Sequence, residues 1–144
     1  MQPLTTLELC ARGGGQALGL EQAGIEHVAL VELDRHACAT LRLNRPKWSV
    51  VQTDTREFDA TPYRGVDIVS GGLPCPPFSV AGKQLVDKDD RNLFPSALRV
   101  ISEVRPRAVM IENVRGIPES GPWGFRPKVK GANSGPDRSS LEWT

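Results

Sequence analysis

Short apolar runs alternate with longer segments of helical periodicity along most of this chain. The apolar runs predict five strands, at residues 4–10, 27–33, 48–52, 66–70 and 107–111. The periodic segments between them predict helices at residues 16–23, 35–43 and 92–104. Strands that alternate with helices are typical of an α/β fold with a doubly wound parallel sheet. The strands contain few polar positions, which predicts burial of both faces of the sheet.

Local signals set the ends of the predicted helices. Gly24 follows the first helix as a C-cap, and Asp34 caps the second. The second helix ends before residues 44–46, because Pro46 disfavours further helix. In the third helix we expect one roughly continuous apolar face, made of Leu93, Ala97, Leu98, Ile101 and Val104.

The composition changes after Ile117. Residues 118–144 are rich in Gly, Pro and Ser and show little apolar periodicity. Such a segment is typical of a loop or a disordered tail. The pattern therefore predicts a partial domain at residues 1–117, which lacks a sixth and seventh strand, and a tail at residues 118–144.

The overall composition limits the classes of protein to consider. The 144 residues carry a formal net charge of +1, so any contact with nucleic acid depends on local patches. No apolar run approaches the length of a membrane span, and no secretory signal is visible, so we expect no membrane partner. The three cysteines, Cys10, Cys38 and Cys75, are widely spaced, which argues against disulfides and a zinc site and favours a cytoplasmic location.

Candidate ligand-binding residues follow the first three predicted strands. Gly13, Gly14 and Gly15 allow the backbone to approach a ligand closely, although a tight turn explains them about as well. Their spacing differs from the dinucleotide-binding fingerprint. Glu32 ends the second strand, where a carboxylate typically binds the hydroxyls of a ribose. Asp54 ends the third strand, where it would hold an adenine amino group; a solvated Glu and a turn-forming Asp remain the alternatives.

A candidate nucleophile follows the fourth strand. Cys75 lies between Pro74 and Pro76, and prolines restrict both their own backbone and that of the preceding residue. Glu112 ends the fifth strand at the same edge of the sheet. A rigid thiol beside a carboxyl group is a plausible nucleophile and acid pair. A small buried side chain in a proline-rich loop is the alternative for Cys75.

These motifs resemble, in order and in spacing, those of the cytosine-5 DNA methyltransferase family. Residues 7–15 resemble the first motif of that family, and Glu32 and Asp54 match the acids of the second and third. Residues 72–79, with the sequence Gly-Leu-Pro-Cys-Pro-Pro-Phe-Ser, resemble its catalytic signature. Residues 90–94 and 112–114 resemble the fifth and sixth motifs, and the last of these reads Glu-Asn-Val.

The resemblance implies a Rossmann-like methyltransferase sheet, incomplete at its C-terminal side, with S-adenosyl-L-methionine as cofactor. It implies a cofactor site made of Cys10, Ala11, Arg12, Gly13, Gly14, Gly15, Glu32, Leu33, Asp54, Thr55, Leu73 and Leu93. It implies catalytic roles for Pro74, Cys75, Glu112 and Asn113. Cys75 would attack C6 of a cytosine flipped out of DNA, Glu112 would hold N3, and residues 79–91 would form a mobile loop.

The chain departs from the family pattern in two ways. Cys10 stands where the family commonly has an aromatic residue, and Arg12 stands where it normally has glycine. The later motifs and the target recognition domain have no counterpart after Ile117. We therefore expect the catalytic part of a DNA methyltransferase, either truncated or completed by a second chain.

Three other functions stay open. The first is a non-catalytic remnant that at most binds the cofactor, and the second is an RNA cytosine-5 methyltransferase with the same chemistry. The third, a nicotinamide-dependent enzyme, is disfavoured because it leaves Cys75 and Glu112 without roles.

Overall fold

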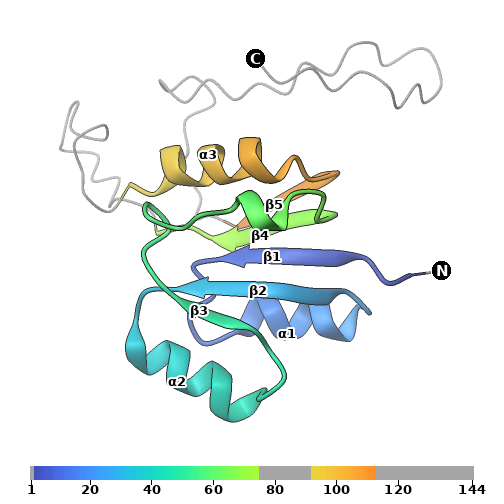
Figure 1. The fold of residues 1–144 in the computed structure, drawn as a ribbon. Coiled ribbons are helices and arrows are strands. Elements are labelled where there is room, and N and C mark those ends of the chain that lie inside the picture. Colours follow the sequence, from blue (N-terminus) through green and yellow to red (C-terminus); the bar gives the residue numbers. More distant parts are fainter. Residues whose placement is uncertain (1, 75–91, 113–144) are drawn as a thin grey trace, which may run out of the picture.

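A computed structural model describes residues 2–74 and 92–112 of the chain. In these residues five strands form one parallel sheet in the order β3-β2-β1-β4-β5 (Figure 1). The strands are β1 (Thr5–Leu9), β2 (Glu26–Glu32), β3 (Val50–Gln52), β4 (Ile68–Gly72) and β5 (Ala108–Glu112). The helices are α1 (Gly15–Gln22), α2 (Arg35–Asn44) and α3 (Phe94–Val104), with a short 3-10 helix, η1 (Thr61–Tyr63).

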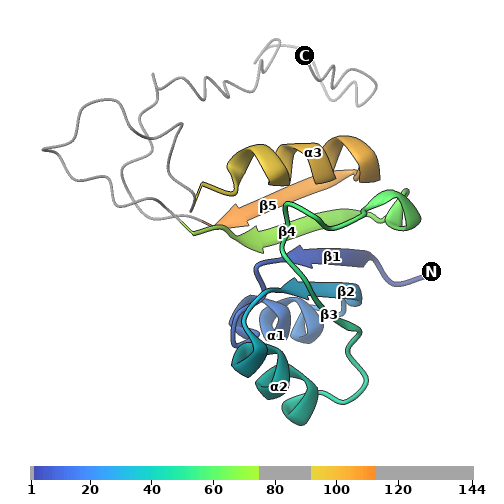
Figure 2. The same cartoon turned by 60° about the vertical axis from the view of Figure 1, so that its left-hand side comes forward.

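The helices cover both faces of the sheet. Leu30 of β2 packs with Ala17 of α1 and Leu41 of α2 in one apolar cluster. Its neighbours in the strand, Ala29 and Val31, belong to the other cluster, which also contains the buried side chains of α3. Successive strand residues point to opposite faces, so α1 and α2 lie on one face and α3 on the other. Figures 1 and 2 show α3 beside β4 and β5, away from α1 and α2.

The strand order reverses at β1. From β1 the chain runs through α1 and α2 outward to β3, and it then returns to β4 on the opposite side of β1. In an open α/β sheet, ligands bind in the crevice beyond the carboxyl ends of the strands at such a reversal. We therefore expect a ligand site at the loops that follow β1, β2, β3 and β4.

The predicted elements are confirmed, with shifts of one or two residues at most ends. The Asp34 carboxylate accepts hydrogen bonds from the backbone N–H groups of His36 and Ala37, both at 2.8 Å, and so caps α2 as expected. Gly24 follows α1 with a φ of 80°, in the left-handed conformation of a C-cap glycine. The short helix η1 was not expected from the sequence.

Two expectations about burial were wrong. Leu98 was placed on the packed face of α3, yet it is 41% exposed, while Val100 is fully buried. The way α3 packs on β4 and β5 decides which of its apolar residues are buried, and the spacing of these residues in the sequence does not decide it alone. In β5, exposed and half-buried residues alternate, so the described part of the chain does not bury both faces of this strand. Its Met110 is 41% exposed.

The sheet also buries polar side chains that the apolar pattern did not predict. Thr6 and Ser70 lie in the adjacent strands β1 and β4, and their hydroxyl oxygens are 3.1 Å apart. Glu8 of β1 is 1% exposed. Among the described residues, no helix has both the length and the hydropathy that crossing a bilayer requires.

Candidate functional site

A cavity of about 670 Å³ opens at the carboxyl ends of the strands. Its volume lies within the range of small-molecule sites. Of the residues predicted to form a site, the cavity brings together Cys10, Arg12, Glu32, Leu33, Asp54, Thr55, Pro74 and Leu93. It is also lined by residues that the sequence did not single out as ligands: Asp34, Arg35, His36, Gln52 and Arg56. These residues lie close to Glu32 or Asp54 in the sequence, and this closeness is the feature from which their place in the cavity could have been predicted.

The turn between β1 and α1 forms one wall of the cavity. Gly14 has a φ of 83°, and a Cβ atom there would lie 2.6 Å from Cδ2 of Leu41. Packing and backbone conformation thus both require glycine at this position. Cys10 and Arg12 adopt the same left-handed region, with φ of 54° and 47°. Non-glycine residues rarely take up this conformation, and here two of them lie at the cavity wall.

Glu32 is fixed at the centre of this wall. Its Oε2 accepts the backbone N–H of Arg12 at 2.7 Å, and its Oε1 accepts that of Asp34 at 2.8 Å. Glu32 is 8% exposed, so the carboxylate has little freedom to move. Each oxygen keeps a further lone pair that can accept a hydrogen bond. Two fixed acceptors on one carboxylate suit a ligand with two adjacent hydroxyl groups.

The N-terminus of α2 lies next to Glu32. Hydrogen bonds from the backbone, with that of Ala37 the strongest, lower the pKa of Asp34. Leu33, between the two acids, is 59% exposed and offers an apolar surface at the cavity. An apolar side chain between fixed polar groups is typical of a site for a flat, partly apolar ligand such as a nucleoside.

Asp54 follows β3 and is already paired. Its Oδ1 accepts the backbone N–H of Arg56 at 2.9 Å, and the Arg56 Nε lies 3.1 Å from the same oxygen. The backbone bond from Arg56 is the main reason that the pKa of Asp54 is lowered. Asp54 is therefore an anion at neutral pH, and a ligand amino group would share it with Arg56.

Thr55 and Cys10 connect the walls formed after β3 and β1. Thr55 is 4% exposed, and its Oγ1 lies 3.8 Å from Sγ of Cys10. Burial is the largest influence on Cys10 and raises the pKa of its thiol. Cys10 is thus a neutral thiol at the cavity wall and a poor nucleophile.

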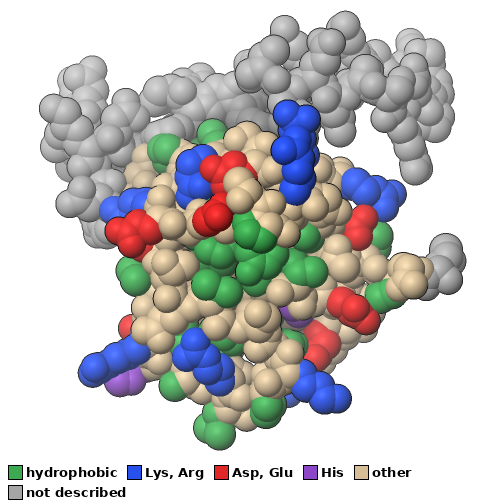
Figure 3. All heavy atoms as spheres, viewed as in Figure 1, with side chains coloured by type: hydrophobic (Ala, Val, Ile, Leu, Met, Phe, Trp, Pro, Cys, Tyr) green, Lys and Arg blue, Asp and Glu red, His purple; other side chains and the backbone are tan. Residues whose placement is uncertain are grey.

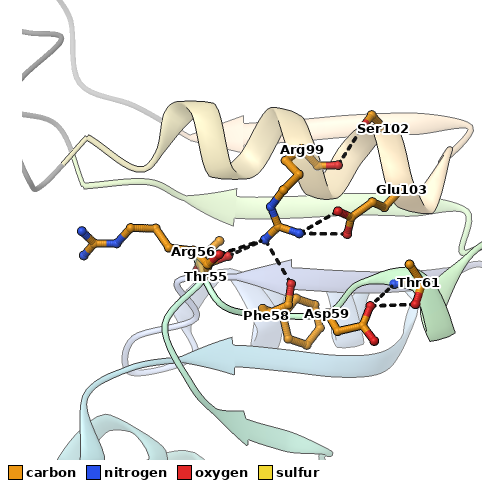
Figure 4. A network of polar contacts seen from close by, with 8 residues as sticks. All are labelled: Thr55, Arg56, Phe58, Asp59, Thr61, Arg99, Ser102 and Glu103. Atoms are coloured by element: carbon orange, nitrogen blue, oxygen red, sulfur yellow. Dashed lines mark hydrogen bonds and ion pairs between the residues drawn. The ribbon is translucent and has the colours of Figure 1, made fainter.

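Arg99 of α3 holds the segment that carries Asp54 and Thr55 (Figure 4). Its Nη2 donates to the carbonyl oxygens of Thr55 at 2.9 Å and of Phe58 at 3.0 Å. Its Nη1 donates to both carboxylate oxygens of Glu103, at 2.7 and 2.9 Å. In the sequence, only the spacing of four residues between Arg99 and Glu103 indicates part of this network.

The residues predicted to be catalytic are only partly described. Pro74 lines the cavity, and Glu112 is exposed at the end of β5. Glu112 pairs in register with Gly72, two residues before Pro74, and its Oε2 lies 3.6 Å from where a Cβ of Gly72 would be. Cys75 and Asn113 lie outside the described residues. The structure thus places Glu112 beside the strand that leads to Pro74.

Other predicted residues lie behind the cavity wall or near it. Within the described part of the chain, the cavity lining does not include Ala11, Gly13, Gly14, Gly15, Leu73 or Glu112. Ala11 and Leu73 are each 5% exposed, so they support the wall from inside. A Cβ at Gly13 or Gly15 would meet nothing within 4 Å, so neighbouring side chains do not require glycine there.

Charge is mixed on the face of the molecule that Figure 3 shows. Acidic and basic side chains alternate over this face, and hydrophobic side chains gather near its centre. The arrangement agrees with the net charge of +1. This face offers no extended patch of one sign in the described residues.

Comparison with known proteins gives a consistent result. The family model of C-5 cytosine-specific DNA methylases matches residues 4–121. The type II methyltransferase M.NgoMIV of Neisseria gonorrhoeae is 58% identical over 113 residues, which are 78% of this chain and 36% of that protein. A solved DNA modification methyltransferase from an Escherichia coli prophage is 32% identical, with a TM-score of 0.60, over 72% of this chain and 30% of that one. A solved DNMT2 of Spodoptera frugiperda is 26% identical, with a TM-score of 0.62, over 78% of this chain and 36% of that one.

Proposed function

Because the chain belongs to the C-5 cytosine-specific DNA methylase family, we propose that it provides the cofactor site and catalytic residues for methyl transfer from S-adenosylmethionine to C5 of cytosine in DNA. The chain spans about a third of the curated relative from Neisseria gonorrhoeae, 36% of its length. The activity of a whole enzyme is therefore part of the proposal. A role in restriction and modification is also part of it, in line with the type II relatives.

The observation that carries the proposal is the fixed carboxylate of Glu32 in the cavity. Two backbone N–H groups hold its oxygens, and their free lone pairs suit the two hydroxyls of a ribose. Asp54 would accept the amino group of the adenine, and Leu33 would pack against the ring. The residues present thus fit the nucleoside part of S-adenosylmethionine.

The methionine part of the cofactor would lie near the turn after β1. Arg12 lines the cavity there with a flexible cationic side chain. It either pairs with the carboxylate of the cofactor or obstructs its approach. When bound, S-adenosylmethionine supplies the methyl group.

The chemistry on the base belongs to the protein side chains. The Cys75 thiolate would add to C6 of the cytosine, while Glu112 holds N3 and donates a proton there. The electron density gained by the ring makes C5 nucleophilic toward the methyl group. Loss of the C5 proton to a base then restores the ring and expels Cys75. The cytosine must leave the duplex for this reaction, because C6 cannot be reached in the base stack.

The test is covalent trapping on DNA that contains 5-fluorocytosine, in the presence of S-adenosylmethionine. Fluorine cannot leave C5 as a proton does, so the Cys75 adduct persists on a denaturing gel. Cys75→Ser should abolish the adduct, while Cys38→Ser should keep it, because Cys38 is buried in α2. An adduct that survives in Cys75→Ser would contradict the assignment. An adduct with a matched RNA and none with DNA would favour the RNA substrate instead.

A further inference from the structure

Two ionisable side chains face each other inside the protein, away from the proposed chemistry. Glu8 of β1 and His27 of β2 each have a side chain that is 1% exposed. Oε2 of Glu8 lies 3.9 Å from Nδ1 of His27. Among the described residues, neither of these atoms has a hydrogen-bond partner. Buried polar atoms without partners are rare and costly, so the pair calls for an explanation.

Both side chains act on the same backbone unit of α1. Nε2 of His27 lies 2.8 Å from the carbonyl oxygen of Ala17. The backbone N–H of Ala17 acts on the Glu8 carboxyl group as a hydrogen-bond donor. Ala17 is fully buried and is the third residue of α1, where the backbone N–H has no partner within the helix. Glu8 and His27 thus hold the first turn of α1 at both polar groups of one residue.

The first turn of α1 is continuous with the wall of the cofactor cavity. The N–H of Leu18 donates to the carbonyl oxygen of Gly14 at 2.8 Å. The N–H of Gly14 donates in turn to the carbonyl oxygen of Ala11 at 2.9 Å. A change in the position of Ala17 therefore reaches the turn that contains Arg12 through two hydrogen bonds.

The geometry determines how many protons the pair needs. The Ala17 carbonyl can only accept, so Nε2 of His27 must carry a hydrogen. Nδ1 then faces Oε2 of Glu8. Without a proton between them, two lone pairs would oppose each other in a site that excludes water. One proton on either atom converts this repulsion into an attraction, and burial, which raises the pKa of Glu8 to about 7, agrees with that proton being retained.

Few charged groups act on the pair from the surrounding elements. Glu21 of α1 interacts electrostatically with His27 and is itself bound by Arg45, just after α2, at 2.9 Å. Trp48 packs against His27, with the ring centroids 5.2 Å apart. On β4, the residue opposite Glu8 is the uncharged Ser70. Glu21 is therefore the group whose charge most needs to be held constant in any test.

We propose that Glu8 and His27 share one proton, carried by either Oε2 or Nδ1 and acting across the 3.9 Å between them, and form a positioning pair, which holds Ala17 and thereby sets the cofactor-binding turn between β1 and α1. The link to the cofactor rests on the proposed function. The pair touches neither the cofactor nor the base, so it acts through α1. Loss of the shared proton leaves Oε2 of Glu8 and Nδ1 of His27 in repulsion, which weakens the hold of His27 on the Ala17 carbonyl oxygen and makes cofactor affinity dependent on pH.

A pair of substitutions at Glu8 separates positioning from packing. Glu8→Gln places an amide N–H toward Nδ1 and an oxygen toward the Ala17 N–H, so it imitates the protonated carboxyl group without titrating. Glu8→Leu keeps the volume and removes both interactions. Binding of S-adenosylmethionine to the 144-residue chain is measured by calorimetry at several values between about pH 6 and pH 9, after circular dichroism shows that each variant is folded.

The expected results differ between the two variants. Glu8→Leu should weaken binding by about three- to tenfold. At low pH, Glu8→Gln should bind S-adenosylmethionine as tightly as the parent does. As the pH rises, the affinity of the parent should fall further than that of Glu8→Gln, because only the parent loses the shared proton. The amino group of the cofactor titrates in both proteins, so their difference isolates the pair. Equal affinity of Glu8→Leu and the parent, or the same decline in Glu8→Gln and the parent, would overturn the proposal.

A second readout is independent of the cofactor. The chain has two histidines, and the exposed His36 provides an internal reference in nitrogen-detected NMR of the imidazole rings. The proposal requires that Nε2 of His27 carries a proton at every pH at which the protein is folded. Deprotonation at Nε2 would exclude the pair. If the parent does not bind S-adenosylmethionine but Nε2 of His27 keeps its proton, the result contradicts the proposed function and still supports the shared proton.

Discussion

Arg99 donates a hydrogen bond to the carbonyl oxygen of Thr55 at 2.9 Å, across 44 positions of sequence. This contact joins α3 to the segment after β3, where Asp54 and Thr55 line the cavity. Glu103 fixes the guanidinium from the other side. The segment that carries the acid expected to hold the adenine thus depends on a side chain of α3.

Arg99→Ala should lower the free energy of unfolding by about 1.5 to 3 kcal/mol, since charged hydrogen bonds to backbone carbonyls are lost. It should also weaken binding of S-adenosylmethionine, because Asp54 loses its support. Urea unfolding and calorimetry measure the two effects. Arg107→Ala is the control, since Arg107 pairs with Asp67, just before β4, and its side chain is 75% exposed. Equal losses in both variants would show that Arg99 contributes only a surface charge.

Glu32→Ala should weaken binding of S-adenosylmethionine by about 1.5 to 3 kcal/mol, as expected for hydrogen bonds to a charged acceptor. The loss includes the freed N–H groups of Arg12 and Asp34, which Glu32 now accepts. Isothermal titration calorimetry gives the affinity. Glu26→Ala serves as the control, because Glu26 is exposed at the other end of β2. Unchanged affinity in Glu32→Ala would remove Glu32 from the cofactor site.

The placement of Glu32 and Asp54 was predictable because it depends on local rules. Each acid follows an apolar strand, and parallel strands bring their carboxyl ends to one edge. The cap at Asp34 and the left-handed Gly24 were predictable for the same reason, since each is set by neighbours in the sequence. These features need no knowledge of how the layers pack.

The features that sequence reasoning missed depend on distant contacts. Glu8 lies in a strand that looked apolar overall, and only the approach of His27 and α1 reveals its environment. Leu98 and Val100 differ in burial because of the rotation of α3 against the sheet. The bond from Arg99 to Thr55 joins residues too far apart for any local pattern.

Arg12→Gly should stabilise the fold and strengthen cofactor binding. Arg12 has a φ of 47°, a conformation that costs a non-glycine residue about 1 kcal/mol or more and that glycine adopts freely. Removing its side chain also opens the cavity wall. Thermal unfolding and titration with S-adenosylmethionine test the two effects separately.

Arg105→Gly is the matched control for Arg12→Gly. Arg105 has a φ of 53° at the end of α3 and does not line the cavity. Arg105→Gly should stabilise the fold by the same relief of backbone strain and should leave cofactor affinity unchanged. If Arg12→Gly instead loses affinity while Arg105→Gly does not, Arg12 pairs with the carboxylate of the cofactor.

Glu8 makes the stability of the protein depend on pH. Burial raises the pKa of Glu8 from 4.5 to about 7, so the folded state binds more protons than the unfolded state between these values. Stability contributed by the protonated group is therefore complete below about pH 4.5 and is lost as the pH rises through about 7. The shift corresponds to a loss of about 3 kcal/mol across this window.

Glu8→Gln should remove this loss, because its amide stays neutral. Urea unfolding at a series of pH values should give curves for Glu8→Gln and the parent that agree near pH 4.5 and separate toward pH 7, with the variant more stable. Asp34 and Asp54, whose pKa values are lowered, contribute the opposite dependence at more acidic pH in both proteins and cancel in the comparison. Glu26→Gln, at an exposed position of β2, should follow the parent throughout. Parallel curves for Glu8→Gln and the parent would mean that Glu8 titrates normally in the folded protein, and that His27 and α1 do not hold a proton there.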